Sequence, residues 1–261
     1  MDYETIILER EEGIATITLN RPEKVNAATL QMITELIEAI GELSRDDNVK
    51  VVILTGAGRV FCPGADHTHP VFKSENPAEV RQWVHQFGEV SFGLRSLPQP
   101  VIASVNGAAV GAGCSFALAC DIIIASENAR FSQGFVNIGL IPDSGGCYFL
   151  PRLIGVAKAC ELVFTGDMID AREAERMGLV NKVVPADLLA TTTRELALRL
   201  AKGPTAALRS AKTCIYQGLE MDLASVIERE TDAQTVCILS EDCKEGLRAF
   251  AEKRPPVFRG R

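Results

Sequence analysis

Alternating and continuous runs of apolar residues predict the β-strands of this chain. Residues 5–9 form a short extended segment, residues 14–19 alternate between apolar and polar side chains, and the polar turn between the two predicts antiparallel pairing. Three continuous apolar runs, at 51–55, 101–105 and 122–125, lack this alternation. Such runs are typical of strands that are covered on both faces of a sheet.

Apolar residues spaced three and four positions apart predict helices between these strands. The first helix is expected over residues 30–43, with Asn26 as its N-cap. The second begins at the sequence Asn-Pro-Ala-Glu of residues 76–79 and is expected to reach about residue 97. That sequence supplies a cap, a first-turn proline and a capping-box glutamate. A short helix is expected at 114–119, after a glycine-rich turn.

The last third of the chain has a mostly helical pattern. We expect helices at 157–164 and at 170–177 (the latter capped by Asp170 and Glu173), a strand at 180–184, and helices from residue 188 onwards. Strands alternating with turns and helices indicate the α/β class. We therefore predict an α/β core over residues 1–195 and a helical region over 196–261.

The composition is that of a globular protein. Hydrophobic residues make up 47% of the 261 positions and charged residues 23%. The 34 acidic residues outnumber the 27 basic ones, and this net charge of -7 argues against binding to nucleic acid or to an anionic membrane surface. No leader pattern and no apolar stretch of membrane-spanning length is seen, so we expect a soluble cytoplasmic protein. Six basic residues against two acidic ones after residue 243 form a basic tail.

The cysteine and histidine patterns do not favour a metal site. None of the eight cysteines forms a C-x-x-C pair, and most are expected to be small buried thiols in a reducing compartment. Asp66, His67 and His69 are close in sequence, but no other carboxylate or imidazole cluster lies near them, so we interpret them as a polar loop.

Two glycine-rich turns that follow buried strands are the candidate sites for chemistry. Residues 111–116 lack the third glycine of a dinucleotide-binding fingerprint, and no G-K-[ST] sequence closes either turn. A serine hydrolase is excluded because all three histidines precede Ser115. Backbone amides in turns of this kind can converge on an anionic oxygen, as in an oxyanion hole. Glycines that only permit tight turns would give the same spacing.

A series of short motifs resembles the crotonase, or enoyl-CoA hydratase/isomerase, superfamily, in unbroken order from about residue 5 to the C-terminus. These motifs are LNRPEK at 19–24, LTGAGRVFC at 54–62, GAD at 64–66, VNG at 105–107, ALACD at 117–121, LPRLIG at 150–155, AREA at 171–174, GLV at 178–180 and EGLRAFAEKR at 245–254.

The resemblance implies a fold, an assembly and a substrate class. The fold is a ClpP-like spiral of ββα repeats with a C-terminal helical region that packs trimers, often as a dimer of trimers. The substrate is an acyl-CoA thioester, and no cofactor beyond this thioester is expected. Two backbone N–H groups, carried over by position to Ala65 and Ala112, would hold the enolate oxygen.

The sequence departs from the family's hydratases at both catalytic glutamates. Ser115 and Phe135 stand at these positions, which makes ordinary hydratase activity doubtful because hydration needs both water activation and proton delivery. Asp143, in a Pro-Asp-Ser-Gly-Gly sequence, resembles the acid/base of the family's phenylacetate-pathway and enoyl-CoA isomerases. With Pro142, Phe135 and Phe149 around it, we expect its pKa to be raised by burial. Alternatively, Asp143 is a turn residue that caps the following helix.

The resemblance also implies residues that bind the substrate. Lys24 and Lys253 are candidates for the phosphates of CoA, with exposed surface lysines as the alternative. Trp83 either lines the acyl pocket or belongs to the core. With the two alanines and Phe135, the motifs place Asp66 and His67 at the substrate site.

An enoyl-CoA isomerase is the function we expect from these residues. Three alternatives remain open: a hydratase (lyase) that uses Asp143 alone, an enzyme in which Asp143 is a nucleophile on an aromatic acyl-CoA as in the family's dehalogenases, and a non-catalytic member that binds acyl-CoA or RNA. The acidic net charge and the lack of a basic stripe on any helix argue against RNA.

Overall fold

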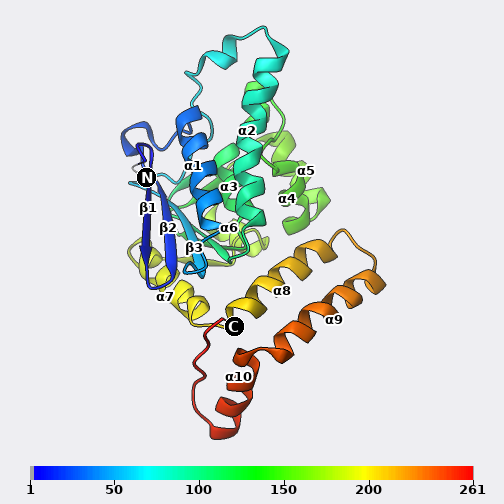
Figure 1. The fold of residues 1–261 in the computed structure, drawn as a ribbon. Helices are drawn as coiled ribbons and strands as arrows, with labels where there is room; N and C mark the ends of the chain where they lie inside the picture. The colour runs from blue at the N-terminus through cyan, green and yellow to red at the C-terminus, as the bar shows by residue number, and fades with distance from the viewer. Residues whose placement is uncertain (1–2, 261) are drawn as a thin grey trace.

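A six-stranded sheet forms the centre of the protein, whose computed structural model describes residues 3–260 (Figure 1). Its strand order is β1-β2-β3-β4-β6-β9, and only the β1–β2 pair is antiparallel. The strands are β1 (Ile6–Glu11), β2 (Ile14–Leu19), β3 (Val51–Gly56), β4 (Val101–Val105), β6 (Ile122–Ser126) and β9 (Lys182–Val184). The predicted strands and the antiparallel pairing of the first two are confirmed, although β9 begins two residues later than expected.

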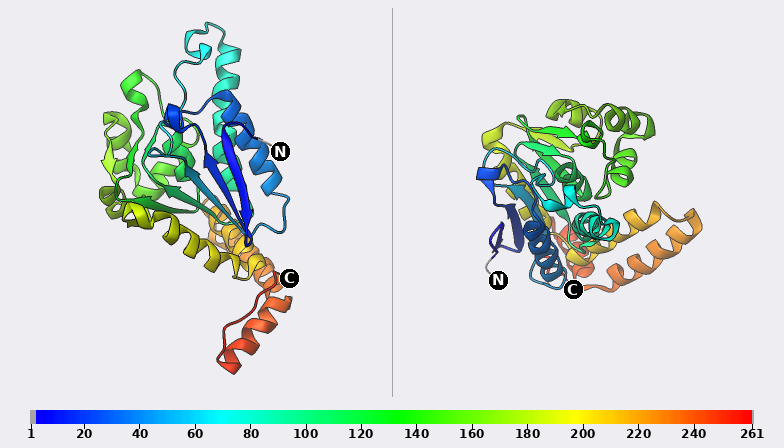
Figure 2. Two further views of the ribbon diagram at one scale, coloured as in Figure 1. Left: turned by 90° about the vertical axis from the view of Figure 1, so that its left-hand side faces the viewer. Right: turned by 90° about the horizontal axis from the view of Figure 1, so that it is seen from above.

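Both faces of this sheet are covered, which explains the continuous apolar runs in its parallel strands. Successive side chains of a strand point to opposite faces. Val52 and Leu54 therefore belong to the larger core cluster, while Val51 and Ile53 belong to a smaller cluster on the other face. The larger cluster lies under α1 (Leu30–Leu43), α2 (Pro77–Ser96) and α3 (Ala112–Ala119), and the smaller one under α7 (Leu189–Ala201). Figure 2 shows α1 and α2 on one side of the sheet and α7 along the other.

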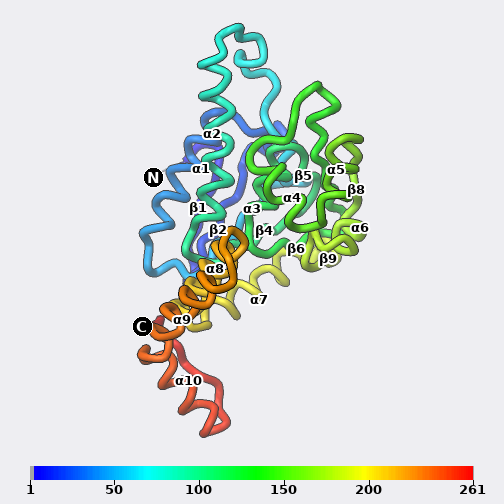
Figure 3. The backbone as a smooth tube through the Cα atoms, turned by 90° about the vertical axis from the view of Figure 1, so that its right-hand side faces the viewer, coloured from blue at the N-terminus to red at the C-terminus, as the bar shows by residue number. Residues whose placement is uncertain are grey.

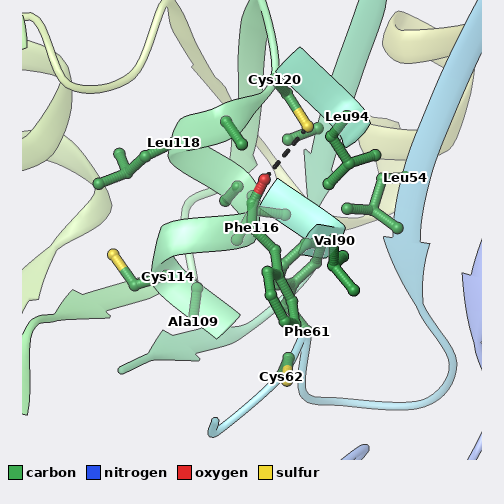
Figure 4. Packing of buried hydrophobic residues seen from close by; sticks show 14 of the residues in the cluster. Leu54, Phe61, Cys62, Val90, Leu94, Ala109, Cys114, Phe116, Leu118 and Cys120 are labelled. Atoms are coloured by element: carbon green, nitrogen blue, oxygen red, sulfur yellow. Dashed lines mark hydrogen bonds between the residues drawn. The ribbon is translucent and has the colours of Figure 1, made fainter. Parts of the chain in front are cut away.

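The larger cluster joins α2 and α3 to the strands and loops that carry the site. Figure 4 shows Phe61 and Phe116 packed among Leu54 of β3 and Val90 and Leu94 of α2. Phe61 and Phe116 are fully buried. The segment that contains Phe61 and helix α3 therefore hold a fixed position relative to each other, because large side chains interlock in a close-packed interior.

Asn26 is not the N-cap of α1, contrary to the sequence prediction. Thr29 has that role, and its hydroxyl accepts a hydrogen bond from the Met32 N–H. Asn26 is instead fully buried in the left-handed region (φ 61°), where its side chain binds three backbone groups of two loops. The caps of α2 and α6 (Ala171–Arg176) at Asn76 and Asp170 are confirmed. Glu79 differs in detail, because it accepts from the Ser74 hydroxyl rather than from the Asn76 N–H.

A second, three-stranded sheet of short strands lies beside the first. It has the order β5-β7-β8, with β5 (Ala108–Val110), β7 (Arg130–Ser132) and β8 (Ile169–Asp170). These strands have two or three residues each and were not predicted. Helices α4 (Gly146–Ile154) and α5 (Val156–Thr165) lie between β7 and β8 in the chain, and the short helices are η1 (Pro22–Lys24), η2 (Pro70–Lys73), η3 (Gly134–Ile138) and η4 (Ala186–Leu188).

The C-terminal helices leave the core after α7. The predicted boundary at residues 195/196 falls inside α7, whose Leu189 and Ala197 pack on the sheet, so α7 belongs with the core. Helices α8 (Thr205–Gly218), α9 (Leu223–Leu239) and α10 (Glu241–Glu252) follow, as a hairpin and a helix that extend away from the rest of the chain (Figure 3). Their large apolar residues are mostly exposed. These residues are Ile215, Leu219, Leu223, Ile227, Val236, Ile238, Leu239, Leu247 and Phe250.

The expectation that most cysteines are buried is wrong for this single chain. Cys62, Cys114 and Cys120 are buried, whereas Cys147 is exposed and the other four are half-buried. Within residues 3–260, no helix combines the length and the apolar composition needed to cross a membrane.

Candidate active site

The candidate site lies where loops that follow β2, β3 and β4 meet. Because these strands are parallel, their carboxyl ends share one edge of the sheet, where α/β proteins usually bind ligands. Two buried or half-buried amides join the loops. The Asn26 side chain bonds to the Arg21 N–H and to the carbonyls of Ala57 and Val60. The Asn106 amide group donates to the carbonyl of Gly56, the last residue of β3, and to the carbonyl of Gly58 in the loop that follows.

Ala65 and Ala112 both line one cavity at this edge. The two neighbours of Ala65 are held by Ala28, through bonds of 2.8 Å from the Ala28 N–H to the Gly64 carbonyl and 2.9 Å from the Asp66 N–H to the Ala28 carbonyl. Ala112 is the first residue of α3, where N–H groups have no partner within the helix. In the described part of the chain, neither the Ala65 nor the Ala112 N–H has a hydrogen-bond acceptor. Both can therefore donate to a ligand.

Two glycines allow the segments that carry these amides to approach each other. A β-carbon added at Gly64, which has φ +97°, would lie 3.6 Å from the Ala112 nitrogen. A β-carbon at Gly113 would lie only 2.2 Å from the Cys62 carbonyl oxygen, so that position of α3 requires glycine. Two backbone amides that both reach one oxygen, one of them at a helix N-terminus, can stabilise negative charge on that oxygen.

The cavity has a volume of about 480 Å³ and mostly apolar walls. One wall comes from α2, through Val80, Trp83 and Val84, and Trp83 is both a cavity wall and part of the core cluster. Further large apolar side chains come from the segments around η2 and η3. They are Val71, Phe72, Phe135, Ile138, Leu140 and Ile141. The family resemblance identified only Trp83 and Phe135 of this set, since the residues of a cavity wall have no regular spacing in the sequence.

Asp143 is the only carboxylate among the described residues that line the cavity. Its side chain is half-buried, and burial raises the pKa of this carboxyl, while a hydrogen bond from the Ser144 hydroxyl to Oδ1 (2.9 Å) acts in the opposite direction. The expected rise in pKa is therefore confirmed. Asp143 does not cap α4 through its side chain, because the N-cap of that helix is Gly145 and no side chain bonds to it. An acid with a raised pKa in an apolar cavity is suited to proton transfer.

Ser115 and Phe135 occupy very different places. Phe135 lines the cavity, whereas Ser115 is fully buried behind it, with its hydroxyl donating to the backbone carbonyl of Asp143 at 3.1 Å. Neither side chain supplies a carboxylate, and the Ser115 hydroxyl is used within the protein. Water activation by a pair of carboxylates is therefore not available in this cavity.

Asp66 and His67 belong to the loop after Ala65, but only His67 lines the cavity. The Asp66 carboxylate accepts from Thr68 and lies 3.3 Å from the Arg21 guanidinium, contacts that hold its pKa below the usual value. His69 accepts from the Val71 N–H and stacks on Trp83. No group of three or more His, Cys, Asp or Glu side chains within residues 3–260 is placed to hold a metal ion.

Lys24 and Lys253 do not line the cavity. Lys24 lies exposed at the end of η1, next to the loop that contains Arg21. Lys253 is exposed at the end of α10, which lies at the opposite end of the molecule from η2 and the start of α2 (Figure 1). A single chain therefore does not bring Lys253 to its own cavity.

Comparison with known proteins places this chain in one enzyme family. The profile of the enoyl-CoA hydratase/isomerase family matches residues 9–261. The chain is 41% identical to the short-chain-enoyl-CoA hydratase of Clostridium acetobutylicum, over 97% of both chains. It is 39% identical to the 1,2-epoxyphenylacetyl-CoA isomerase of Escherichia coli, over 99% of both chains. A crystal structure of an enoyl-CoA hydratase from Bacillus anthracis superposes with a TM-score of 0.94 at 38% identity, covering 99% of this chain and 100% of the other.

Proposed function

The chain belongs to the enoyl-CoA hydratase/isomerase family and has the crotonase fold, and from this premise we propose that it is an enoyl-CoA isomerase. The observation that carries the proposal is the single carboxylate of the cavity. Asp143 faces a cavity that is also lined by the Ala65 and Ala112 amides. A 1,3-proton shift needs one group that removes a proton and returns it elsewhere, whereas hydration also needs an activated water molecule.

The reaction proceeds through a dienolate. In the ionised state, Asp143 removes a proton from the carbon between the thioester carbonyl and the double bond of a 3-enoyl-CoA. The C–H electrons form a new double bond toward the carbonyl carbon, and the negative charge moves to the thioester oxygen. The protonated Asp143 then gives the proton to the far carbon of the original double bond, which leaves a 2-enoyl-CoA and the ionised carboxylate.

The two backbone amides stabilise the dienolate more than the substrate, since the oxygen is more negative in the dienolate. One such donor contributes about 3 kcal/mol to transition-state stabilisation in enzymes where it has been removed. The apolar walls exclude water from the dienolate and strengthen these interactions. They also favour an apolar acyl group, which contacts Trp83, Phe72 and the residues around η3.

The coenzyme part of the substrate carries phosphates and requires cations. We propose Lys24 for this role, because it lies next to the loop that joins β2 to the site. Lys253 can serve only from a second copy of the chain, given its distance from its own cavity (Figure 1). We further propose a homotrimer or a dimer of trimers, in which neighbouring copies cover the exposed apolar residues of α8–α10.

A hydratase that uses Asp143 alone is the second candidate. It is favoured by the 41% identity to a protein named as a short-chain-enoyl-CoA hydratase. The two functions differ in their products, since hydration gives a 3-hydroxyacyl-CoA and isomerisation only moves the double bond.

One experiment separates these functions. The protein is incubated in heavy water with a 3-enoyl-CoA or a 2-enoyl-CoA, and the double-bond position, the added hydroxyl and deuterium at the α-carbon are followed by mass spectrometry and NMR. We expect conversion of the 3-enoyl-CoA without hydroxyl addition. Formation of 3-hydroxyacyl-CoA from the 2-enoyl-CoA at an equal or higher rate would replace the isomerase by the hydratase. Binding without any exchange would indicate a non-catalytic protein.

A further inference from the structure

Ser115 lies directly behind the backbone of Asp143. Its hydroxyl donates a hydrogen bond of 3.1 Å to the Asp143 carbonyl oxygen, although the two residues are 28 positions apart in the chain. Ser115 has no exposed surface and does not line the cavity. The contact is therefore with the main chain that holds Asp143, on the side away from the substrate.

Gln133 extends this contact to a second segment. Its side-chain Nε2 donates to the Ser115 hydroxyl at 3.4 Å, and the side chain is almost fully buried. The space is tight, because a β-carbon added at Gly146 would lie 2.9 Å from the Gln133 Oε1 and 3.1 Å from the Ser115 Oγ. Gly146, the first residue of α4, thus packs against the Ser115 and Gln133 side chains.

The turn that presents Asp143 has an unfavourable backbone conformation. The Gly146 N–H donates to the Asp143 carbonyl at 2.8 Å, and the two residues between them, Ser144 (φ 51°) and Gly145 (φ 81°), are both in the left-handed region. These angles correspond to a type I′ turn, which strongly prefers glycine or asparagine where Ser144 stands. Such a conformation persists only when surrounding contacts enforce it. The Asp143 carbonyl is the point where the bonds from Gly146 and Ser115 meet.

We propose that Ser115 is a positioning residue for proton transfer: with Gln133, it fixes the turn so that the Asp143 carboxylate points into the cavity beside the Ala65 and Ala112 amides. The inference rests on the proposed role of Asp143 as the acid/base. It gives Ser115 a function although its hydroxyl never reaches the substrate.

Loss of this bond changes catalysis rather than substrate binding. In Ser115→Ala the turn has fewer restraints, and a displacement of the carboxylate by about 1 Å lowers the rate of proton transfer by about 10- to 100-fold. The KM is unchanged because the cavity walls and the amides remain. A carboxylate that reaches water more easily also has a lower pKa, so the acidic limb of the kcat/KM profile moves to lower pH.

Few other titratable groups lie near Asp143, where their ionisation could contribute to this pH profile. His67 is the only other titratable side chain lining the cavity within the described residues. On α3, burial raises the pKa of the Cys114 thiol to about 12. On α4, Cys147 contacts the Pro142 carbonyl, and Arg95 of α2 packs on the ring of Phe149. A shift of the acidic limb is therefore assigned to Asp143 by comparing the wild type with variants that differ from it at Ser115 alone.

The matched control is Ser104→Ala. Ser104 is also buried, and its hydroxyl bonds to Thr193 at 3.0 Å on the opposite face of the sheet. Both variants lose a buried hydroxyl, but only Ser115→Ala loses a contact with Asp143. Ser115→Cys keeps nearly the same volume with a weak donor, and it replaces the alanine variant if that protein does not fold.

Steady-state kinetics of the isomerisation from pH 4 to pH 9 test the proposal, together with thermal unfolding of each variant. We expect a 10- to 100-fold lower kcat, an unchanged KM and a limb at lower pH for Ser115→Ala or Ser115→Cys, and wild-type kinetics for Ser104→Ala. Equal kinetics in the Ser115 and Ser104 variants would overturn the proposal. An active Asp143→Asn variant would instead overturn the proposed function, so the two failures are distinguishable.

Discussion

The Ser144 hydroxyl donates a hydrogen bond of 2.9 Å to Oδ1 of Asp143, the residue that precedes it. Ser144 is buried and has a φ of 51°, a conformation that costs a non-glycine residue about 1–2 kcal/mol. The bond stabilises the ionised carboxylate, while burial in the apolar cavity destabilises it. The pKa of Asp143 is thus the balance of two opposing effects, of which burial is the larger.

Removing the Ser144 hydroxyl should raise the pKa of Asp143 further. Asp143 acts as a base only when it is ionised, so activity falls below its pKa. We expect the acidic limb of kcat/KM to move upward by about one pH unit in both Ser144→Ala and Ser144→Gly. This direction is opposite to that expected for Ser115→Ala. A limb that stays in place in both variants would show that this bond does not set the pKa.

The two Ser144 variants should differ in stability. Glycine adopts a φ of 51° at no steric cost, so Ser144→Gly should be more stable than Ser144→Ala by about 1 kcal/mol. Urea unfolding measures this difference, and a more stable alanine variant would contradict the backbone argument.

Asp143→Asn should abolish turnover but increase stability at neutral pH. The variant keeps the cavity and should bind CoA esters with wild-type affinity in calorimetry. Because the pKa of Asp143 is raised in the folded state, the wild type loses stability as the pH rises from the unfolded value, about 3.9, through the folded value. The gain in melting temperature for Asp143→Asn should therefore be absent at pH 3.5 and should grow to a plateau near neutral pH. A gain that is the same at every pH would mean that ionisation is not its cause.

The Gly113→Ala substitution should impair the site by separating its two amides. The added β-carbon would lie 2.2 Å from the Cys62 carbonyl, so α3 must move away from the segment that carries Ala65. We expect at least a tenfold loss of kcat and a loss of about 1–3 kcal/mol in the free energy of unfolding. The control is Gly41→Ala in α1, where an added β-carbon meets nothing within 4 Å and should stabilise the helix by about 1 kcal/mol. Wild-type kinetics in Gly113→Ala would exclude the amide of Ala112 from catalysis.

Replacement of Lys24 or Lys253 by alanine should weaken binding of the coenzyme without changing the chemical step. We expect the KM to rise by about three- to tenfold at constant kcat, and less so at high salt. A substrate that lacks the 3′-phosphate tests whether the lysine contacts this phosphate. If it does, replacing the lysine leaves the KM of such a substrate unchanged. Lys182→Ala, at an exposed lysine of β9, is the control. An unchanged KM in either lysine variant would assign that residue to the ordinary surface.

Local patterns in the sequence predicted the central sheet and its helices, because buried strands and amphipathic helices leave a signal within ten or twenty residues. The short strands β5, β7 and β8 give no such signal, since two or three residues show no periodicity. Asn26 illustrates a different limit. Its local sequence is that of a helix cap, but its amide instead bonds to Ala57 and Val60, which are more than 30 positions away.

The candidate site was predicted to a similar extent. Asp143 and the two alanines were identified by their motifs, and the structure brings all three to one cavity. The contact between Ser115 and Asp143 was not predicted, because it depends on how α3 packs against the turn before α4. Lys253 shows that a motif match does not place a residue at the site of its own chain.

Lys212 of α8 joins the C-terminal helices to the core through a largely buried ion pair with Asp121. Their charged atoms are 2.7 Å apart, Lys212 also donates to the Gln99 carbonyl, and the Tyr216 hydroxyl bonds to the other Asp121 oxygen. Lys212→Ala leaves the Asp121 carboxylate buried without its cation, which should cost about 3–5 kcal/mol in the free energy of unfolding. The helices α8–α10 carry the exposed apolar residues of the proposed assembly, so the variant should also dissociate more readily in sedimentation velocity. Lys158→Ala, which removes an exposed pair with Glu161, should change stability by less than about 1 kcal/mol. Equal stability and equal sedimentation in the two variants would mean that the Lys212–Asp121 pair does not anchor α8.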